Sequence, residues 1–411
     1  MGEQSTVEQS AELKQSAELE QSAALKQSWD DFCERLKAAK EMVFHPDAPA
    51  SALDRAAGLR MLARNIALAL DVQYENADPL RPELTHYFDW RRKQGGDNAD
   101  ALYLGAIIDG RETYRVSGNL GTASFIAFTA IDSGITPWGG AASGTLVASA
   151  LQADAAGNFE LILSPESQPG NWLQTSEKTL RVTIRQFFGD WENETPMRAR
   201  IERIGADLLA PEFTADALMS GLRRSADWLG EVTRYWHQTL SLWRARPLEF
   251  LSFRELTNNG IDATPGGEPF LAYWALAADE ALIIRVYPPR QASYWNFEFG
   301  NWWMETMDYR HRLTSTNHQQ AVREYDGEVI LVVAHDDPGV PNWLDASGYA
   351  SGYIVCRWMG SDSTPQPSIQ RIKREALLDN LPPFIQRIDA DSRRLQIAAR
   401  RRGIAKRFSG F

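Results

Sequence analysis

The stretch "PGNWLQT" (Pro169–Thr175) returns later in the chain as "VPNWLDA" (Val340–Ala346). Each copy follows a turn that contains proline and precedes a strand-like run with an arginine near its end. The Asn amide can hydrogen-bond the backbone of such a turn, and the Trp can anchor the returning strand on a core. Self-similarity at a fixed period indicates duplication. We therefore predict two tandem modules and a structural role for the Asn-Trp-Leu motif.

The similarity between the copies extends beyond this motif. "YRV" (Tyr114–Val116) matches "IRV" (Ile284–Val286), and "AGNFELIL" (Ala156–Leu163) matches "DGEVILVV" (Asp326–Val333). Short apolar or alternating runs bounded by Gly, Pro and Asp are typical of antiparallel strands. The Asp-Gly pair in "AIIDGRETYRV" (106–116) predicts a hairpin. The fold class is therefore α+β and mostly β, with two tandem antiparallel β-sandwich or jelly-roll-like modules.

Helical segments are expected at the N-terminus, in the middle and at the C-terminus. Ser28 is a candidate helix cap, followed at helical spacing by Trp29, Phe32, Leu36 and Val43. Further helices are predicted at 51–74 and 214–243. The predicted organisation is a low-complexity extension (1–27) that is frayed or weakly helical, a helical region (28–99), module 1 (100–195), a helical connector (196–268), module 2 (269–362) and a basic helical tail (363–411).

Composition limits the class of protein. The 411 residues carry a net charge of −11, which disfavours nonspecific nucleic-acid binding, and include only two cysteines, which suits a reducing compartment. No apolar run is long enough to span a membrane, so the cytoplasm is the expected location. The basic end "ARRRGIAKRF" (399–408) is either an arm for anionic partners or, the favoured interpretation, a segment docked on the acidic body or a second subunit. Segment 214–243 and this tail are the expected contacts of a homo-oligomer.

Arg115 and Arg285, Arg185 and Arg357, and Asn171 and Asn342 recur in both copies, which favours a scaffold role for them. A site is expected where the copies differ, and they differ most in "NFEFGNWWMETMDYRHRLTSTNHQQAVREY" (296–325). Histidine is suited to proton transfer near pH 7 and needs a carboxylate partner. The candidate catalytic residues are His311, His318, Asp308 and Glu305; the candidate substrate-binding residues are Arg310, Arg312, Tyr309, Trp302, Trp303, Glu298 and Asn296.

Two functional hypotheses remain open. The first is a cofactor-independent hydrolase or lyase acting on a small hydroxylated or ring-containing metabolite, such as a carbohydrate or steroid-like compound. The second is a non-catalytic carbohydrate- or small-ligand-binding protein that uses the Trp-rich face of module 2. A scaffold without a small ligand is a third. A metal site formed by His311, His318 and His335 matches no zinc signature, and no metal or cofactor is predicted. The chain has no Walker loop, no GxGxxG after a strand and no GxSxG elbow.

Several blocks together resemble one bacterial family, domain of unknown function 1214. They are "GGDNADALYLGAIIDGRETYRVSGNLGT" (95–122), "NWLQT" (171–175), "LRVTIRQFFGDWENE" (180–194) and "YWNFEFGNWW" (294–303) with the second Asn-Trp-Leu block. The resemblance covers most of residues 85–362. It implies a β-sandwich fold, often encoded among catabolic genes, and no established reaction.

Overall fold

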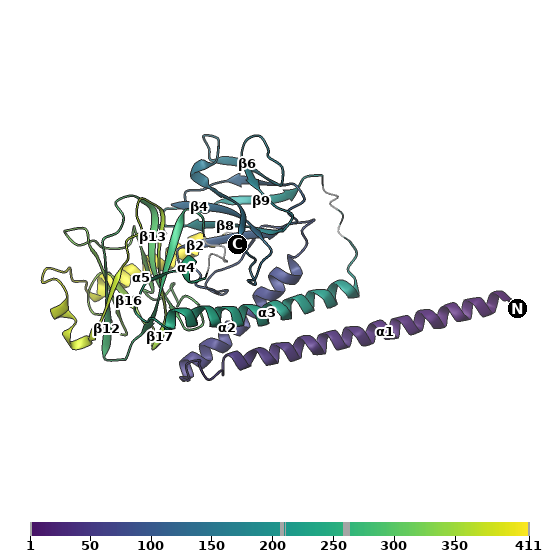
Figure 1. The fold of residues 1–411 in the computed structure, drawn as a ribbon, viewed down its shortest axis with the longest axis horizontal. Coiled ribbons are helices and arrows are strands. Elements are labelled where there is room, and N and C mark those ends of the chain that lie inside the picture. The colour runs from purple at the N-terminus through teal and green to yellow at the C-terminus, as the bar shows by residue number, and fades with distance from the viewer. Residues whose placement is uncertain (1, 206–208, 210, 258–263, 410–411) are drawn as a thin grey trace.

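The computed structural model describes residues 2–205, 209, 211–257 and 264–409. Module 1 pairs a five-stranded sheet with a four-stranded sheet (Figure 1). The first has the order β1 (Thr85–His86), β2 (Ala101–Ile107), β8 (Thr179–Phe187), β4 (Phe125–Asp132) and β5 (Ala142–Val147). The second has the order β7 (Trp172–Gln174), β6 (Asn158–Ser164), β3 (Tyr114–Asn119) and β9 (Arg198–Arg203).

Module 2 repeats this plan strand for strand. Its five-stranded sheet has the order β10 (Leu251–Ser252), β11 (Gly267–Ala275), β17 (Ser351–Ser361), β13 (Ala292–Asn301) and β14 (Ser315–Asn317). Its four-stranded sheet has the order β16 (Trp343–Asp345), β15 (Val329–Ala334), β12 (Glu280–Val286) and β18 (Ser368–Lys373). Within each module the two sheets share one apolar core. The predicted α+β fold with two tandem β-rich modules is confirmed.

The Asn-Trp-Leu motif makes the same contacts in both modules. Asn171 Nδ2 donates to the carbonyls of Gln152 and Glu160, at 2.8 Å each. Asn342 Nδ2 donates to the carbonyls of Val322 and Ile330, at 2.7 and 3.1 Å. Asn171 Oδ1 also accepts from the backbone N–H of Gln152, and Asn342 Oδ1 accepts from the backbone N–H of Val322. The indoles of Trp172 and Trp343 donate to strand carbonyls at 3.1 and 3.0 Å. The motif therefore ties the start of β7 or β16 to the neighbouring strand, β6 or β15, and to the loop before that strand.

Three local predictions are wrong. Residues 106–116 form no hairpin, because β2 pairs with β8 in one sheet and β3 pairs with β6 in the other. The Asp-Gly turn therefore links two layers of the sandwich. The module boundaries at 195 and 362 are too early, because β9 and β18 complete the four-stranded sheets. These edge strands, "RARIER" and "SIQRIK", are rich in charge and lack the apolar signal of central strands.

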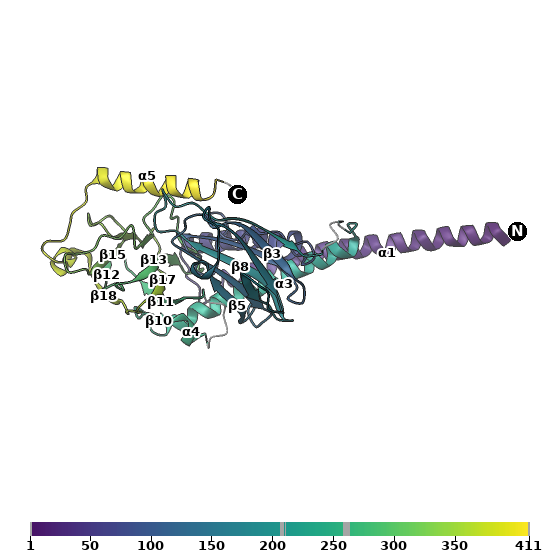
Figure 2. The ribbon, with the colours of Figure 1, turned by 90° about the horizontal axis from the view of Figure 1, so that it is seen from above.

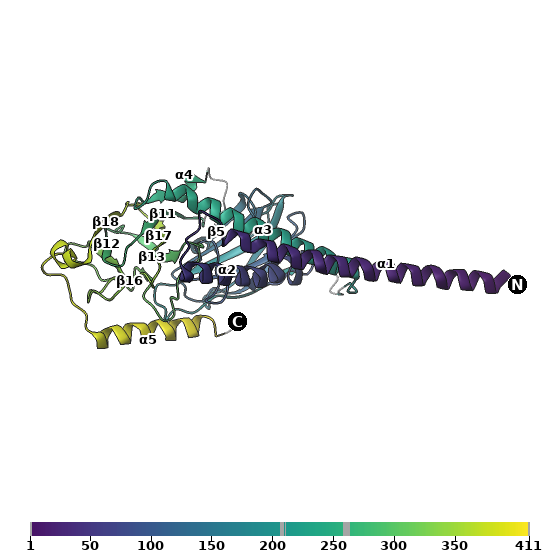
Figure 3. The same ribbon diagram turned by 90° about the horizontal axis from the view of Figure 1, so that it is seen from below.

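Three long helices lie along one side of the modules (Figures 1 and 3). They are α1 (Gly2–Ala39), α2 (Ala52–Leu70) and α3 (Ala215–Arg244). Helix α1 is continuous through Ser28, so Ser28 is not a cap and the extension is helical rather than frayed. Its good helix formers and lack of internal Gly or Pro account for this continuity. Trp29 is exposed, whereas Phe32 is buried. Ser51 caps α2 and Thr214 caps α3.

The C-terminal segment forms α5 (Ala390–Arg407), which lies along both modules (Figure 2). Arg393 pairs with Asp337 of module 2 at 2.9 Å. Arg400 donates to the carbonyls of Tyr309 and Ser315, and Arg407 donates to the carbonyl of Ala99. All three guanidinium groups belong to buried residues. The basic tail therefore docks on the body of its own chain. A short helix, α4 (Phe253–Leu256), follows β10.

The five-stranded sheets of the two modules pack against each other. One apolar cluster combines Ala127 and Phe187 of module 1 with Tyr294 and Met359 of module 2. The rings of Phe187 and Tyr294 stack with their centroids 5.0 Å apart. The structure contains no helix, among its described residues, that is both long and apolar enough to cross a membrane.

Candidate ligand pocket between the two modules

A polar segment runs through the boundary between the modules. It is "KQGGDNAD" (93–100), in which Lys93, Gln94, Asp97, Asn98 and Asp100 are all buried. Buried polar groups are stable only when they are hydrogen-bonded. The partners of this segment therefore define a polar layer inside the protein.

One part of this layer joins the segment to module 2. Asn98 Nδ2 donates to the hydroxyl of Tyr294 at 3.0 Å, and that hydroxyl donates to Asp100 at 2.7 Å. Asn296 Nδ2 donates to the amide oxygen of Asn98 at 3.0 Å. Asn317 Nδ2 donates to Asp100 at 2.9 Å. Asn296, a predicted site residue, therefore holds the two modules together.

An ion pair extends the layer. Arg357 on β17 donates to Glu298 on β13 at 2.8 Å, and its second amino group donates to the carbonyl of Gly96 at 2.8 Å. Glu298 also accepts from the backbone N–H of Ala99 at 3.0 Å. Burial disfavours the charge of Arg357, yet the adjacent carboxylate holds its pKa above the ordinary value. Arg357 is therefore a fixed cation at the module boundary.

A pocket opens beside this ion pair. Its empty volume is about 1050 Å³, part of which is open solvent. Three arginines, Arg181, Arg185 and Arg357, line it together with Asp97. Its apolar wall is mainly aromatic. The aromatic residues are Tyr87, Phe88, Tyr103, Trp138, Tyr235, Trp236 and Phe253.

The pocket wall is assembled from both modules and from α3. Arg181, Thr183 and Arg185 alternate along β8 and so project from one face of it. The Arg181 guanidinium lies over the ring of Trp138, 4.5 Å from the centroid. Gly95 has a φ of +65°, and a Cβ there would lie 2.2 Å from the ring of Trp236. A side chain at Gly95 would therefore displace the indole that closes this side of the pocket.

Several buried polar atoms of the wall have no hydrogen-bond partner among the residues that the structure describes. They include Oγ1 of Thr183, the hydroxyl of Tyr235 and Nε1 of Trp236. An unpartnered buried donor or acceptor costs about 1–3 kcal/mol. A bound molecule can recover this cost. The pocket thus offers cationic groups, aromatic faces and unused hydrogen-bonding atoms.

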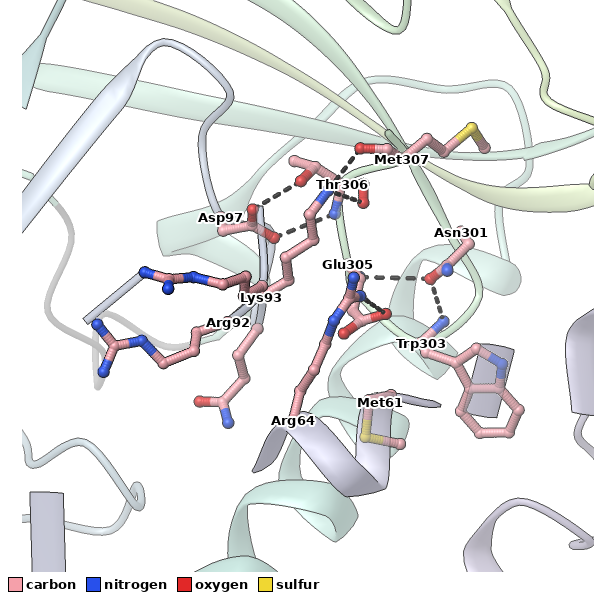
Figure 4. A network of polar contacts seen from close by, with 12 residues as sticks. Met61, Arg64, Arg92, Lys93, Asp97, Asn301, Trp303, Glu305, Thr306 and Met307 are labelled. Carbon is pink, nitrogen blue, oxygen red and sulfur yellow. Dashed lines mark hydrogen bonds and ion pairs between the residues drawn. The ribbon is translucent and has the colours of Figure 1, made fainter. Parts of the chain in front are cut away.

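A second polar cluster lies behind the pocket wall (Figure 4). Asp97 accepts from the backbone N–H and the hydroxyl of Thr306, at 3.0 and 2.6 Å. Lys93 Nζ donates to the carbonyls of Thr306 and Met307 at 2.8 and 2.5 Å. Arg64 pairs with Glu305 at 2.9 Å. The cluster anchors the segment from which Asp97 reaches the pocket.

Burial shifts the pKa values of the ionisable groups in this cluster. It raises the pKa of Glu305 to about 7, against the opposing effect of Arg64. It lowers the pKa of Lys93 to about 8, against the opposing effect of Asp97. It also raises the pKa of Asp97, which Lys93 partly offsets. A carboxyl group with a raised pKa can serve as a general acid.

The predicted site residues are divided between several places. Glu305, Asp308, Arg310 and Arg312 line a second pocket with Arg60, Arg64 and Lys93. Asp308 pairs with Arg310, and Arg312 pairs with Asp345 at 2.7 Å. Neither pocket is lined by His311 or His318. His311 is exposed. His318 is half-buried, with its ring 5.7 Å from that of Tyr294.

The predicted aromatic residues are packed inside the protein. Trp302 and Trp303 are buried in the core between the helices and module 2, and Trp303 donates to the carbonyl of Asp54 at 2.8 Å. Tyr309 is buried, with Lys93 over its ring. Arg185 and Arg357, for which the repeat favours a scaffold role, lie on the pocket wall. The repeat carried this signal, because both copies place an arginine on the outer face of the central strand.

Comparisons with known proteins place the chain in a family. A model of proteins of unknown function, DUF1214, matches residues 101–189. The crystal structure of an uncharacterised protein from Burkholderia cenocepacia is 33% identical, with a TM-score of 0.81. That match covers 85% of this chain and 98% of the other. The chain belongs to the DUF1214 family.

The DUF1214 match spans β2 to β8 and so includes the three pocket residues of β8. The VPA0106 protein from Vibrio parahaemolyticus is 12% identical, with a TM-score of 0.44, over 76% of this chain and 98% of its own. No curated protein matches the chain. The pocket residues on α3, Tyr235 and Trp236, lie outside the DUF1214 match and had no sequence signal beyond their place in an amphipathic helix.

Proposed function

We propose that this protein binds a small ring-containing metabolite that carries an anionic group, in the pocket between the modules. The observation that carries the proposal is the composition of the wall, where three arginines stand among seven aromatic residues. Arginine favours carboxylate and phosphate groups through paired donors, and aromatic faces favour rings. The unpartnered Thr183 hydroxyl and Trp236 indole add two hydrogen-bonding atoms for the ligand.

A cofactor-independent hydrolase or lyase is the second candidate, favoured by one residue. Asp97 lines the pocket, is buried and has a raised pKa. Such a carboxyl can donate a proton to a leaving group beside the arginines. Enzyme and binding protein then differ in one respect. Asp97→Asn keeps ligand affinity in both, and abolishes turnover only in the enzyme.

The test is a thermal-shift screen of tag-free protein against matched pairs of compounds. Each pair contains a cyclic or aromatic carboxylate and its neutral amide, and sugars and sterols form separate sets. A ligand at 100 times its dissociation constant stabilises the protein by about 2.7 kcal/mol. We expect ring carboxylates to raise the melting temperature more than their amides. Stabilisation by sugars or sterols alone, with no response to any ring carboxylate, would refute the anionic ligand.

Arg185→Met assigns a hit to this pocket, and Arg312→Met is its control. Both substitutions remove one guanidinium, but Arg312 belongs to the second pocket. We expect Arg185→Met to weaken the hit at least tenfold and Arg312→Met to leave its affinity unchanged. The reverse pattern would place the ligand in the second pocket, whose wall contains four of the eleven site residues predicted from sequence.

A further inference from the structure

Two histidines and a carboxylate that do not line the pocket between the modules lie close to one another. His45 and Asp47 lie in the loop after the short helix Lys40–Met42, and His237 lies on α3. One ligand atom from each of the three lies within 4.8 Å of the other two. The Nδ1 atom of His45 is 3.5 Å from a carboxylate oxygen of Asp47. The rings of His45 and His237 have centroids 5.3 Å apart.

This spacing is close to that of ligands around one metal ion. Zinc binds histidine nitrogen and carboxylate oxygen at about 2.0–2.2 Å in tetrahedral geometry, which places two such ligand atoms about 3.3–3.6 Å apart. The 3.5 Å between His45 Nδ1 and the Asp47 carboxylate lies in this range. This nitrogen also accepts from the backbone N–H of Asp47 at 3.2 Å, a hydrogen bond that coordination through Nδ1 would replace. His45 and Asp47 are on a loop and Asp47 is exposed, so we expect their side chains to rotate toward an ion.

A second observation points to a ligand at the same position. The Nδ1 atom of His237 is buried and has no hydrogen-bond partner among the described residues. A histidine nitrogen in this state loses its bond to water without replacement. Coordination to a metal would satisfy it.

We propose that His45, Asp47 and His237 bind one divalent transition-metal ion of the zinc class. Imidazole and carboxylate ligands suit zinc and its neighbours better than they suit magnesium or calcium, which prefer oxygen alone. Three protein ligands leave a fourth position for water. The ion links the loop to α3, immediately after Tyr235 and Trp236 of the ligand pocket. Metal binding therefore stiffens the helical wall of that pocket.

The experiment uses the full chain without an affinity tag, freed of metal by chelation. Equilibrium dialysis against micromolar zinc measures stoichiometry, and cobalt substitution reports the ligand field by absorption. We expect one zinc per chain and a tetrahedral cobalt spectrum. We expect zinc to raise the melting temperature. Less than 0.2 equivalents of zinc at micromolar concentrations would overturn the proposal.

Variants locate the ion. His45→Gln, Asp47→Asn and His237→Gln should each weaken zinc binding at least tenfold, whereas His311→Gln, at an exposed histidine elsewhere, should not. Zinc that binds equally well to all four variants lies elsewhere, which would also overturn the proposal. Circular dichroism of the metal-free variants verifies folding. Loss of the metal site leaves the pocket arginines in place, so the ring-carboxylate screen tests the proposed function separately.

Discussion

Arg185 on β8 and Arg357 on β17 line the same pocket from different modules. Each is on the central strand of a five-stranded sheet, and the two sheets have the same strand order. Because the modules pack through these sheets, duplication brought two copies of one arginine position to a shared cavity. Arg357 is committed to Glu298, with 2.8 Å between them. The repeat thus built both the scaffold and the pocket.

The Glu298–Arg357 pair should be essential to stability. Arg357→Met leaves Glu298 as a buried carboxyl without its cation, which costs about 3–5 kcal/mol. Urea unfolding followed by circular dichroism measures this loss. The double variant Arg357→Met with Glu298→Gln should recover part of it. Arg115→Met is the control, because Arg115 pairs with carboxylates that are partly exposed and should cost at most about 1 kcal/mol. Equal losses for the two arginines would contradict the assignment.

The two Asn-Trp-Leu copies should differ in energy although their contacts match. Asn342 is 6% exposed, and its alanine variant leaves buried backbone groups without partners, at a cost of about 2–3 kcal/mol. Asn171 lies nearer the surface, where water can replace the amide. Asn171→Ala should therefore cost less, about 1 kcal/mol. Chemical denaturation of both variants checks the order. A larger loss for Asn171→Ala would show that the motif does not act through buried backbone groups.

Stability should fall with rising pH because of Glu305. Its pKa is about 7 in the folded chain, whereas the ordinary value is 4.5. Between these values the folded state holds a proton that the unfolded state has released. The free energy of unfolding therefore decreases by up to about 1.4 kcal/mol per pH unit in that window. Glu305→Gln removes the contribution of Glu305 to this slope, whereas Glu298, whose pKa burial raises to about 8, keeps its own. Urea unfolding from pH 4.5 to 8 tests it, and parallel profiles for variant and wild type would contradict it.

Lys93 should produce the opposite slope at higher pH. Its pKa is about 8 in the folded chain against an ordinary value of 10.5. The folded state therefore loses its proton first, and stability falls as pH decreases from about 10.5 to 8. Lys93→Met should flatten the profile only in this range. A change of slope below pH 7 instead would contradict burial as the cause.

Helix α5 should depend on one arginine rather than on its total charge. Arg400 is buried and donates to the hydroxyl of Ser315 and to the carbonyls of Tyr309 and Ser315. Arg400→Met should therefore cost about 2–4 kcal/mol of stability. Arg401 is exposed. Arg401→Met removes the same charge as Arg400→Met but should change stability by less than about 0.5 kcal/mol. Thermal melting compares the pair. Equal effects would mean that α5 is held by net charge.

The fold was predictable from sequence because duplication repeats its strongest signals. Strands such as β12 and β15 are apolar runs, and the Asn-Trp-Leu motif recurs with its surroundings. The edge strands β9 and β18 were not predictable, because their charged residues lack an apolar period. The Asp109–Gly110 turn was misread because a local turn signal does not reveal whether its strands share a sheet.

The pocket was predictable only in part. The segment in which the two copies differ most contains Glu305 and Arg310, which do line a pocket, and His311, which is exposed. The cavity between the modules depends on the packing of two sheets and one helix. Its residues are therefore far apart in the chain, as Arg181, Trp236 and Arg357 show. The burial of the polar residues in "KQGGDNAD" could not be predicted from sequence, because a polar loop that contains glycine is ordinarily exposed.

Calorimetric titration of the best ring carboxylate from the screen into wild type and Thr183→Val tests ligand binding in the pocket between the modules most directly. The substitution keeps the shape of the side chain and removes the buried hydroxyl that has no partner. We expect binding to the wild type and a loss of about 1–2 kcal/mol in the variant, or roughly 5- to 30-fold in affinity. Unchanged affinity in Thr183→Val, with Arg185→Met also unaffected, would show that the ligand does not occupy the pocket between the modules.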